Sequence, residues 1–186
     1  GNPLVAEDVL PLHRFSGDED RIDVGPEGHR AAAPGLVEGL RFRRAMLDEL
    51  LHITGLAVLA TDDERGPYTS LLAIAPCPEG DAIAFATRRD TSKYQNLLQS
   101  PVASMLLDTR ASDGEDLDHV CAATIVGTTT ELTGDRADRM ASLLQDRHPS
   151  LADFLGSDSC AIMRLDIDRW HIISGFHPEN GTQHEE

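Results

Sequence analysis

The residues with the clearest capacity for chemistry are basic side chains between a predicted buried strand and a predicted short helix. Lys93 is the only lysine among the sixteen lysines and arginines of the sequence, and Arg88 and Arg89 shortly precede it. Thr91 and Ser92 add hydroxyl donors at the same turn. A helix start exposes unpaired N–H groups and the positive end of the helix dipole, so cations there are unfavourable unless an anion binds. The cluster therefore predicts a phosphate site for a phosphorylated cofactor.

Hydrophobic periodicity indicates the elements that must position this cluster. Apolar runs separated by turn residues predict strands at residues 53–61, 67–77, 82–87, 102–109, 119–132 and 160–174. The last of these is expected to be one bent strand or two strand segments. Helical spacing predicts a long helix from Leu36, the short helix 92–99, a helix opened by residues 133–135 and a second short one after Pro149.

Strands that arrive in hairpins, with helices inserted between them, predict a mainly β fold with α decoration, a mostly antiparallel barrel. Gly127, inside the fifth strand, is expected to mark a bulge. The alternating βαβ rhythm and the GxGxxG motif of a Rossmann sheet are missing. We expect an extended or partly disordered N-terminal arm at 1–34, one barrel domain at 35–176 and a polar tail at 177–186.

Composition narrows the classes of partner. The formal net charge of −16 predicts repulsion of nucleic acid and of anionic membranes. No apolar run has the length of a membrane span, and the cysteines show no CxxC spacing, so a cytoplasmic protein without a disulfide framework is expected. His119 and Cys121 share a strand face without a third ligand nearby, so no metal site is predicted.

The segment FATRRDTSKYQNLLQSPVASMLL at 85–107 resembles the flavin-binding core of the pyridoxamine 5′-phosphate oxidase-like split-barrel family. A strand ending in Thr, a turn, a Lys after a polar residue, a short helix and a Ser-Pro stop follow one another as in that family. The similarity continues through 55–75 and 122–132. It implies an antiparallel split β-barrel, a flavoprotein with FMN held between the subunits of a homodimer.

The resemblance also implies which residues hold the cofactor. The phosphate would be contacted by Thr87, Ser92 and Lys93, with Arg88 nearby. The backbone around the second strand would line the isoalloxazine ring, at Thr69, Ser70, Leu71 and Leu72. Ser92 stands where the family often has Arg, and Arg88 and Arg89 are expected to supply the missing charge.

Other departures point away from the family's best-known reaction. The Arg-x-His substrate signature is absent from the segment IISGFHPENGTQHEE at 172–186, so pyridoxamine phosphate is not expected to be the substrate. The leading helix RFRRAMLDELL resembles the haem-utilisation branch, in which a C-terminal histidine binds haem; His177 and His184 lie in such a tail. The leading hypothesis is an FMN-dependent oxidoreductase acting with a small-molecule substrate or electron donor, and the alternative is a non-catalytic flavin- or haem-binding module. The sequence identifies no catalytic side chain.

Overall fold

The computed structural model describes residues 34–63, 65–78, 80–110 and 120–174. The predicted polar tail, the predicted arm up to residue 33, and His119, His177 and His184 lie outside the described residues. In chain order the elements are α1 (Pro34–Ile53), β1 (Leu56–Asp63), β2 (Gly66–Pro76), β3 (Ala82–Arg88), α2 (Ser92–Gln99), β4 (Val102–Asp108), β5 (Cys121–Leu132), α4 (Asp135–Arg147), η2 (Pro149–Leu151), α5 (Ala152–Leu155) and β6 (Cys160–Ser174).

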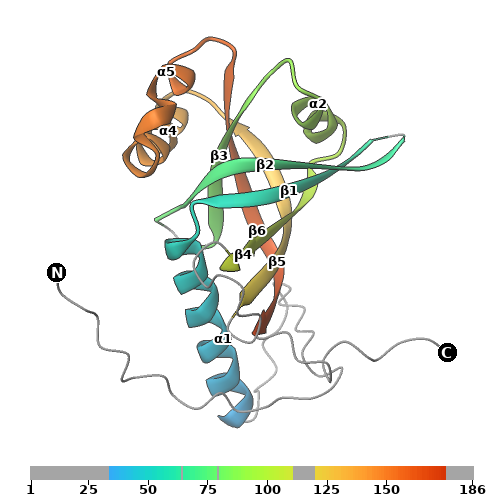
Figure 1. Ribbon diagram of the computed structural model, residues 1–186, viewed down its shortest axis with the longest axis vertical. Helices are drawn as coiled ribbons and strands as arrows, with labels where there is room; N and C mark the ends of the chain where they lie inside the picture. The colour runs from blue at the N-terminus through green and yellow to red at the C-terminus, as the bar shows by residue number, and fades with distance from the viewer. Residues whose placement is uncertain (1–33, 64, 79, 111–119, 175–186) are drawn as a thin grey trace.

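The strands of the described residues close into an antiparallel barrel in the order β1-β2-β3-β6-β5-β4, with β1 and β4 completing the ring. Figure 1 shows α1 below the barrel, and α2 and the α4–α5 pair at the opposite end. The predicted antiparallel split barrel with α decoration is confirmed.

One seam of the barrel is mostly open. β3 pairs with β6 along its whole length, from Ala82 to Arg88. Its pairing with β2 covers only 74–76 on the β2 side. The preceding part of β2, 66–73, therefore has β1 as its strand partner on one edge and none on the other. In an antiparallel strand alternate residues direct their N–H and C=O groups to opposite edges, so part of this backbone faces the gap without a strand partner.

Two apolar clusters hold the fold. Inward-facing strand residues such as Ile74 and Phe85 fill the barrel, and Leu47 and Leu50 of α1 join the same cluster. A second cluster joins α4 to the barrel, where Leu144 is fully buried. Helices α1 and α4 thus each cover part of the barrel surface.

The boundary between α1 and β1 differs from the prediction. The expected strand 53–61 begins three residues later, because α1 continues to Ile53. The helix closes at Thr54, whose backbone N–H and Oγ1 both donate to Leu50 O, at 2.9 and 2.6 Å. Arg147 also donates to three carbonyls at this helix end, those of Leu51, His52 and Thr54. These contacts lie between distant segments, so local periodicity could not reveal them.

The last strand is continuous. β6 runs from Cys160 to Ser174, and its register with β5 shifts between Val126 and Gly127. The irregularity predicted at Gly127 is present, but the extra residue lies on β6: Val126 pairs with Arg169 and Gly127 with Ile167, which leaves Asp168 without a partner in the register. A Cβ atom on Gly127 would lie 2.1 Å from the backbone oxygen of Asp166, so only glycine fits at this close approach of two strands.

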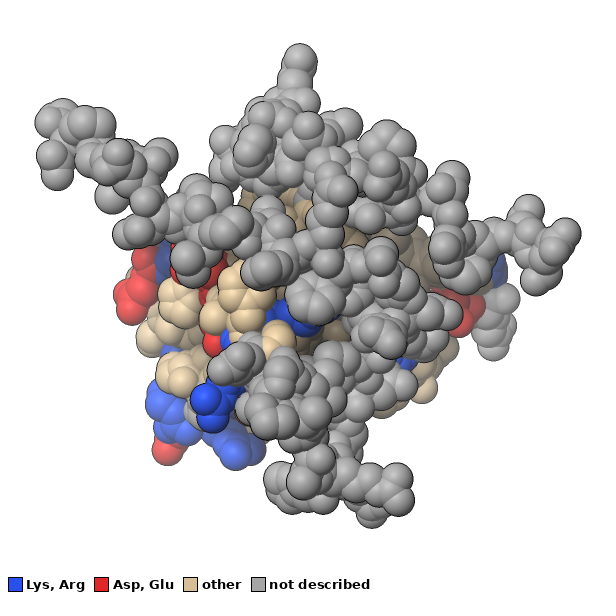
Figure 2. All heavy atoms as spheres, turned by 90° about the horizontal axis from the view of Figure 1, so that it is seen from below, with Lys and Arg blue, Asp and Glu red and all other residues tan. Residues whose placement is uncertain are grey.

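Charged side chains at the α1 end are interspersed. Arg44 of α1 pairs with Asp48 at 3.0 Å and with Asp81 of the β2–β3 turn at 2.7 Å. In the view from below, basic and acidic side chains lie beside one another on the described surface (Figure 2). Among the described helices, none has the length and apolar character needed to cross a membrane.

Replacing Gly127 by Ala is expected to destabilise the protein by about 1–3 kcal/mol, because the new methyl group must push β5 away from β6. Urea unfolding measures the effect. Gly39→Ala in α1 is the matched control: a Cβ there meets no atom within 4 Å, so stability should stay level or rise by up to about 1 kcal/mol. Equal behaviour of both variants would contradict the steric explanation.

Candidate functional site

A pocket of about 250 Å³ lies at the open seam, and we name it the β2–β3 opening. Both strand edges, the start of α2 and the α5 region contribute to its wall. Its lining residues are Leu71, Leu72, Ala73, Ala86, Thr87, Arg88, Thr91, Lys93, Leu151 and Phe154. An apolar wall with hydroxyl groups and two cations at one end suits a ligand with a flat apolar part and an anionic end.

The structure brings six of the nine residues predicted for the cofactor together in this opening. They are Leu71, Leu72, Thr87, Arg88, Thr91 and Lys93. Thr69, Ser70 and Ser92 do not line it. Ser70 lies opposite the buried core residue Leu59, so its side chain shares the inner side of the barrel wall.

The start of α2 leaves its first N–H groups without a side-chain cap. Thr91 stands at the N-cap position with extended backbone, but its hydroxyl donates to Arg88 O at 2.8 Å instead of to the helix. Thr91 Oγ1 also lies 3.1 Å from Oγ1 of the buried Thr87. The uncapped N–H groups make this a donor-rich corner of the kind that binds anions, with the two hydroxyls beside them.

The three basic residues of the cluster have different surroundings. Arg88 is held by both carboxylate oxygens of Asp90, at 2.9 and 2.6 Å. These hydrogen bonds hold the pKa of the Asp90 carboxyl below its usual value. Lys93 makes no hydrogen bond or ion pair within the described part of the chain. Lys93 is therefore the cation of the opening that is available to a bound anion.

Arg89 contacts the opposite side of the turn and does not line the opening. Its guanidinium donates to Asp158 O at 2.9 Å, to Cys160 O and to Glu131 Oε1 at 2.6 Å. Glu131 also accepts from the hydroxyl of buried Tyr94 in α2, at 2.7 Å, and this hydrogen bond raises the Tyr94 pKa. Arg89 thus joins the turn before α2 to β5 and to the start of β6. It does not supply the charge expected of it in the phosphate site.

The side chain of Ser70, in β2 beside the opening, has an unpaired hydroxyl group. Within the described residues, Ser70 Oγ is the buried side-chain polar atom without a hydrogen-bond partner. Buried hydroxyl groups are nearly always paired, because an unpaired one loses its hydrogen bonds to water without replacement. Its position one residue before Leu71 places this unpaired group next to the strand segment that borders the opening.

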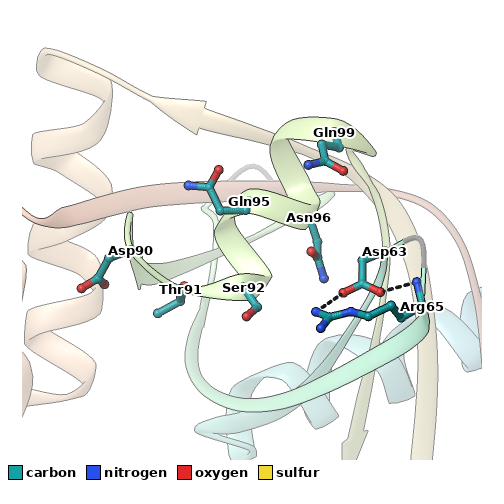
Figure 3. Close-up of a pocket in the computed structure, with 8 residues that line it drawn as sticks. All are labelled: Asp63, Arg65, Asp90, Thr91, Ser92, Gln95, Asn96 and Gln99. Atoms are coloured by element: carbon teal, nitrogen blue, oxygen red, sulfur yellow. Dashed lines mark hydrogen bonds and ion pairs between the residues drawn. The ribbon is translucent and has the colours of Figure 1, made fainter.

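A second cavity, of about 460 Å³, lies along the other side of α2. Its wall combines the α2 face and the β1–β2 hairpin, and is lined by Asp63, Arg65, Asp90, Thr91, Ser92, Gln95, Asn96 and Gln99. Figure 3 shows Asn96 extending from α2 towards the ion pair of Asp63 and Arg65. Ser92, the remaining residue predicted to contact the phosphate, lines this second cavity instead of the β2–β3 opening. Within the described residues, no group of three His, Cys, Asp or Glu side chains is placed to hold a metal ion.

The closed antiparallel barrel with one open seam and a donor-rich helix start beside it defines a split-barrel protein. A sequence model of the pyridoxamine 5′-phosphate oxidase family matches residues 44–174. The chain belongs to this family. A comparison of the sequence with curated proteins gives no match.

Solved structures with the same fold include haem-binding and FAD-binding proteins. A haem-binding protein from Mycobacterium smegmatis is 18% identical with a TM-score of 0.61; the match covers 68% of this chain and 52% of that one, about half its length. The haem storage protein HutZ from Vibrio cholerae is 15% identical, with 70% and 93% covered and a TM-score of 0.59. A FAD-binding protein from Mesorhizobium loti is 13% identical, with 69% and 90% covered and a TM-score of 0.56. At these identities the similarity shows the fold alone.

Sequence reasoning missed part of the wall. Leu151 and Phe154 line the opening from the η2–α5 segment. A short helix after Pro149 was expected there, but its position over the seam depends on tertiary packing. Ala86 and Ala73 border the gap on β3 and β2. The strong apolar character of both strands is compatible with a closed seam, so it could not reveal the opening.

The different contacts of Arg88 and Arg89 generate a stability prediction. Arg89→Gln should lower the urea midpoint of unfolding, because Glu131 and two backbone carbonyls lose their donor together. Arg88→Gln, the matched control, should leave the midpoint nearly unchanged, since only the exposed Asp90 loses a partner. A larger loss for Arg88→Gln would mean that the positions of the two arginines are exchanged.

Proposed function

We propose that the chain is a flavoprotein that binds FMN in the β2–β3 opening and acts as an FMN-dependent oxidoreductase. The observation that carries the proposal is the combination in one pocket of an unpaired strand edge, an apolar wall and an anion-type corner with a free lysine. FMN has three matching parts: a polar ring edge, an apolar ring face and a phosphate.

The residues present fit each part of the cofactor. Backbone groups of 71–73 on the open edge of β2 can pair with the polar edge of the isoalloxazine ring. Phe154 and Leu151 offer apolar contact to the ring face. Thr87, Thr91 and Lys93 surround the corner where a phosphate would meet the α2 N–H groups.

Bound flavin supplies hydride or electron transfer, and the protein supplies binding, orientation and exclusion of water. The residues that line the opening include no Asp, Glu or His. No proton-transfer role is therefore assigned to a side chain of this pocket.

The second candidate function is a non-catalytic flavin- or haem-binding module. The haem-binding protein from Mycobacterium smegmatis and the haem storage protein HutZ favour haem, whereas no histidine lines the β2–β3 opening. An absorption spectrum of the purified protein distinguishes the cofactors: flavin gives paired bands in the near-ultraviolet and blue, and haem gives one dominant Soret band. Oxidation of a nicotinamide donor by the flavin-loaded protein would then favour the enzyme over the binding module.

Lys93→Ala should weaken FMN binding roughly ten- to a hundredfold, because one charge-assisted hydrogen bond to the phosphate is lost. Riboflavin has the same ring and no phosphate, so its affinity should hardly change. Isothermal titration of both ligands measures the difference. Arg136→Ala, an exposed change on α4, controls for net charge. Equal losses for FMN and riboflavin would contradict the assignment of Lys93 to the phosphate.

A homodimer is part of the proposal. Leu71, Val58 and Leu106 are register neighbours on three adjacent strands, and Leu71 and Leu106 are 65% and 38% exposed. This outer face borders the opening, whose 250 Å³ is below the roughly 300 Å³ at which ligand pockets begin. A second copy packed on this face would cover apolar surface and deepen the pocket.

Light scattering should therefore give about twice the 20.2 kDa mass of one chain. Replacing Val102 and Leu106 by Glu should yield monomers and weaken FMN binding, because both side chains are exposed on β4 of this face. Phe42→Glu, an exposed change on α1, is the matched control and should leave the dimer intact. A wild-type monomer at micromolar concentration would rule out the dimer.

A further inference from the structure

We propose that Asp90 is a specificity-determining residue of the β2–β3 opening: by holding Arg88, it lowers the preference of the site for phosphorylated over unphosphorylated flavin. This inference rests on the proposed flavin site and concerns how strongly that site binds the phosphate. It starts from Arg88 because this arginine lines the opening, whereas the carboxylate that binds it does not.

The turn before α2 holds Arg88 and Asp90 together. Arg88 Nε donates to Asp90 Oδ1 at 2.9 Å, and Arg88 Nη2 donates to Oδ2 at 2.6 Å. Thr91 closes the turn, since its backbone N–H and its hydroxyl both donate to Arg88 O, at 3.2 and 2.8 Å. A paired, two-bond contact of this kind fixes the direction of the guanidinium as well as its position. Two donors of Arg88 are thus directed at Asp90 in the protein without ligand.

The charges around the start of α2 are balanced except at Lys93. Arg89 binds Glu131 on the far side of the turn, at 2.6 Å. Arg88 is neutralised by Asp90, at the same distance. In the described wall of the opening, Lys93 is therefore the cation without a carboxylate partner. A phosphate monoester carries about −1.5 to −2 charges at neutral pH, more than one lysine compensates.

Asp90 also lies where a bound phosphate would be attracted. Figure 3 shows it directly before Thr91 and Ser92 at the first turn of α2. A carboxylate there interacts with the positive end of the helix dipole and repels a second anion. The side chains of Arg88 and Asp90 are 58% and 62% exposed, so their ion pair contributes little to stability. We therefore expect the effect of Asp90 on anion binding and not on folding.

Isothermal titration of the full chain, freed of any copurified flavin, with FMN and with riboflavin tests the inference. Asp90→Asn keeps the shape of the side chain and removes its charge. FMN affinity should rise about tenfold, the gain expected from one charge-assisted hydrogen bond, and riboflavin affinity should stay within about twofold. Adding Arg88→Gln to Asp90→Asn should return FMN affinity to within about threefold of the wild-type value, because both charges of the pair are then removed together.

Glu49→Gln is the matched control. It makes the same change in net charge at an exposed position of α1, at the end of the barrel opposite α2 (Figure 1), and should preserve both affinities.

The outcomes separate this inference from the proposed function. If the wild-type protein binds FMN and Asp90→Asn does not change the ratio of FMN to riboflavin affinity, the inference is wrong and the flavin site stands. If the double variant keeps the gain in FMN affinity, Asp90 acts by repulsion alone and not by holding Arg88, and the inference also fails. If the wild-type protein binds neither flavin, the proposed function fails and this inference with it.

Discussion

The site depends on one constraint, the unequal pairing of β3 with its two neighbours. β3 pairs with β6 over all of Ala82–Arg88, but with β2 only at 74–76 of that strand. The backbone hydrogen bonds to β6 hold the end of β3 away from β2 and keep the seam open. The opening, its unpaired strand edge and the direction in which the chain enters α2 all follow from this separation.

Arg89 fixes the position of the turn that follows β3. Because its guanidinium is bound to Glu131 and to carbonyls at 158 and 160, the turn after β3 is fixed to β5 and to the chain entering β6. Tyr94 fixes the first turn of α2 to the same carboxylate. The donor-rich corner is thus held in place before any ligand arrives, which reduces the free energy needed to organise it on binding.

Much of this architecture could be predicted from the sequence, because the evidence is local. Alternation and turn residues located the strands, Gly127 marked the position of a register shift, and the crowded residues Thr91 and Lys93 lie in one pocket of the structure. What could not be predicted depends on contacts between distant segments. The carboxylate that binds Arg89 lies on β5, and the carbonyls to which Arg147 donates lie at the end of α1. The contact of α5 with the seam depends on tertiary packing.

A crystal structure of the flavin-loaded protein tests the central claim most directly. We expect the isoalloxazine ring between 71–73 of β2 and the end of β3, with a phosphate oxygen within hydrogen-bond distance of Lys93 Nζ and of an α2 backbone N–H. A ring bound elsewhere on the barrel, or a phosphate remote from Lys93, would contradict the account even if flavin binds.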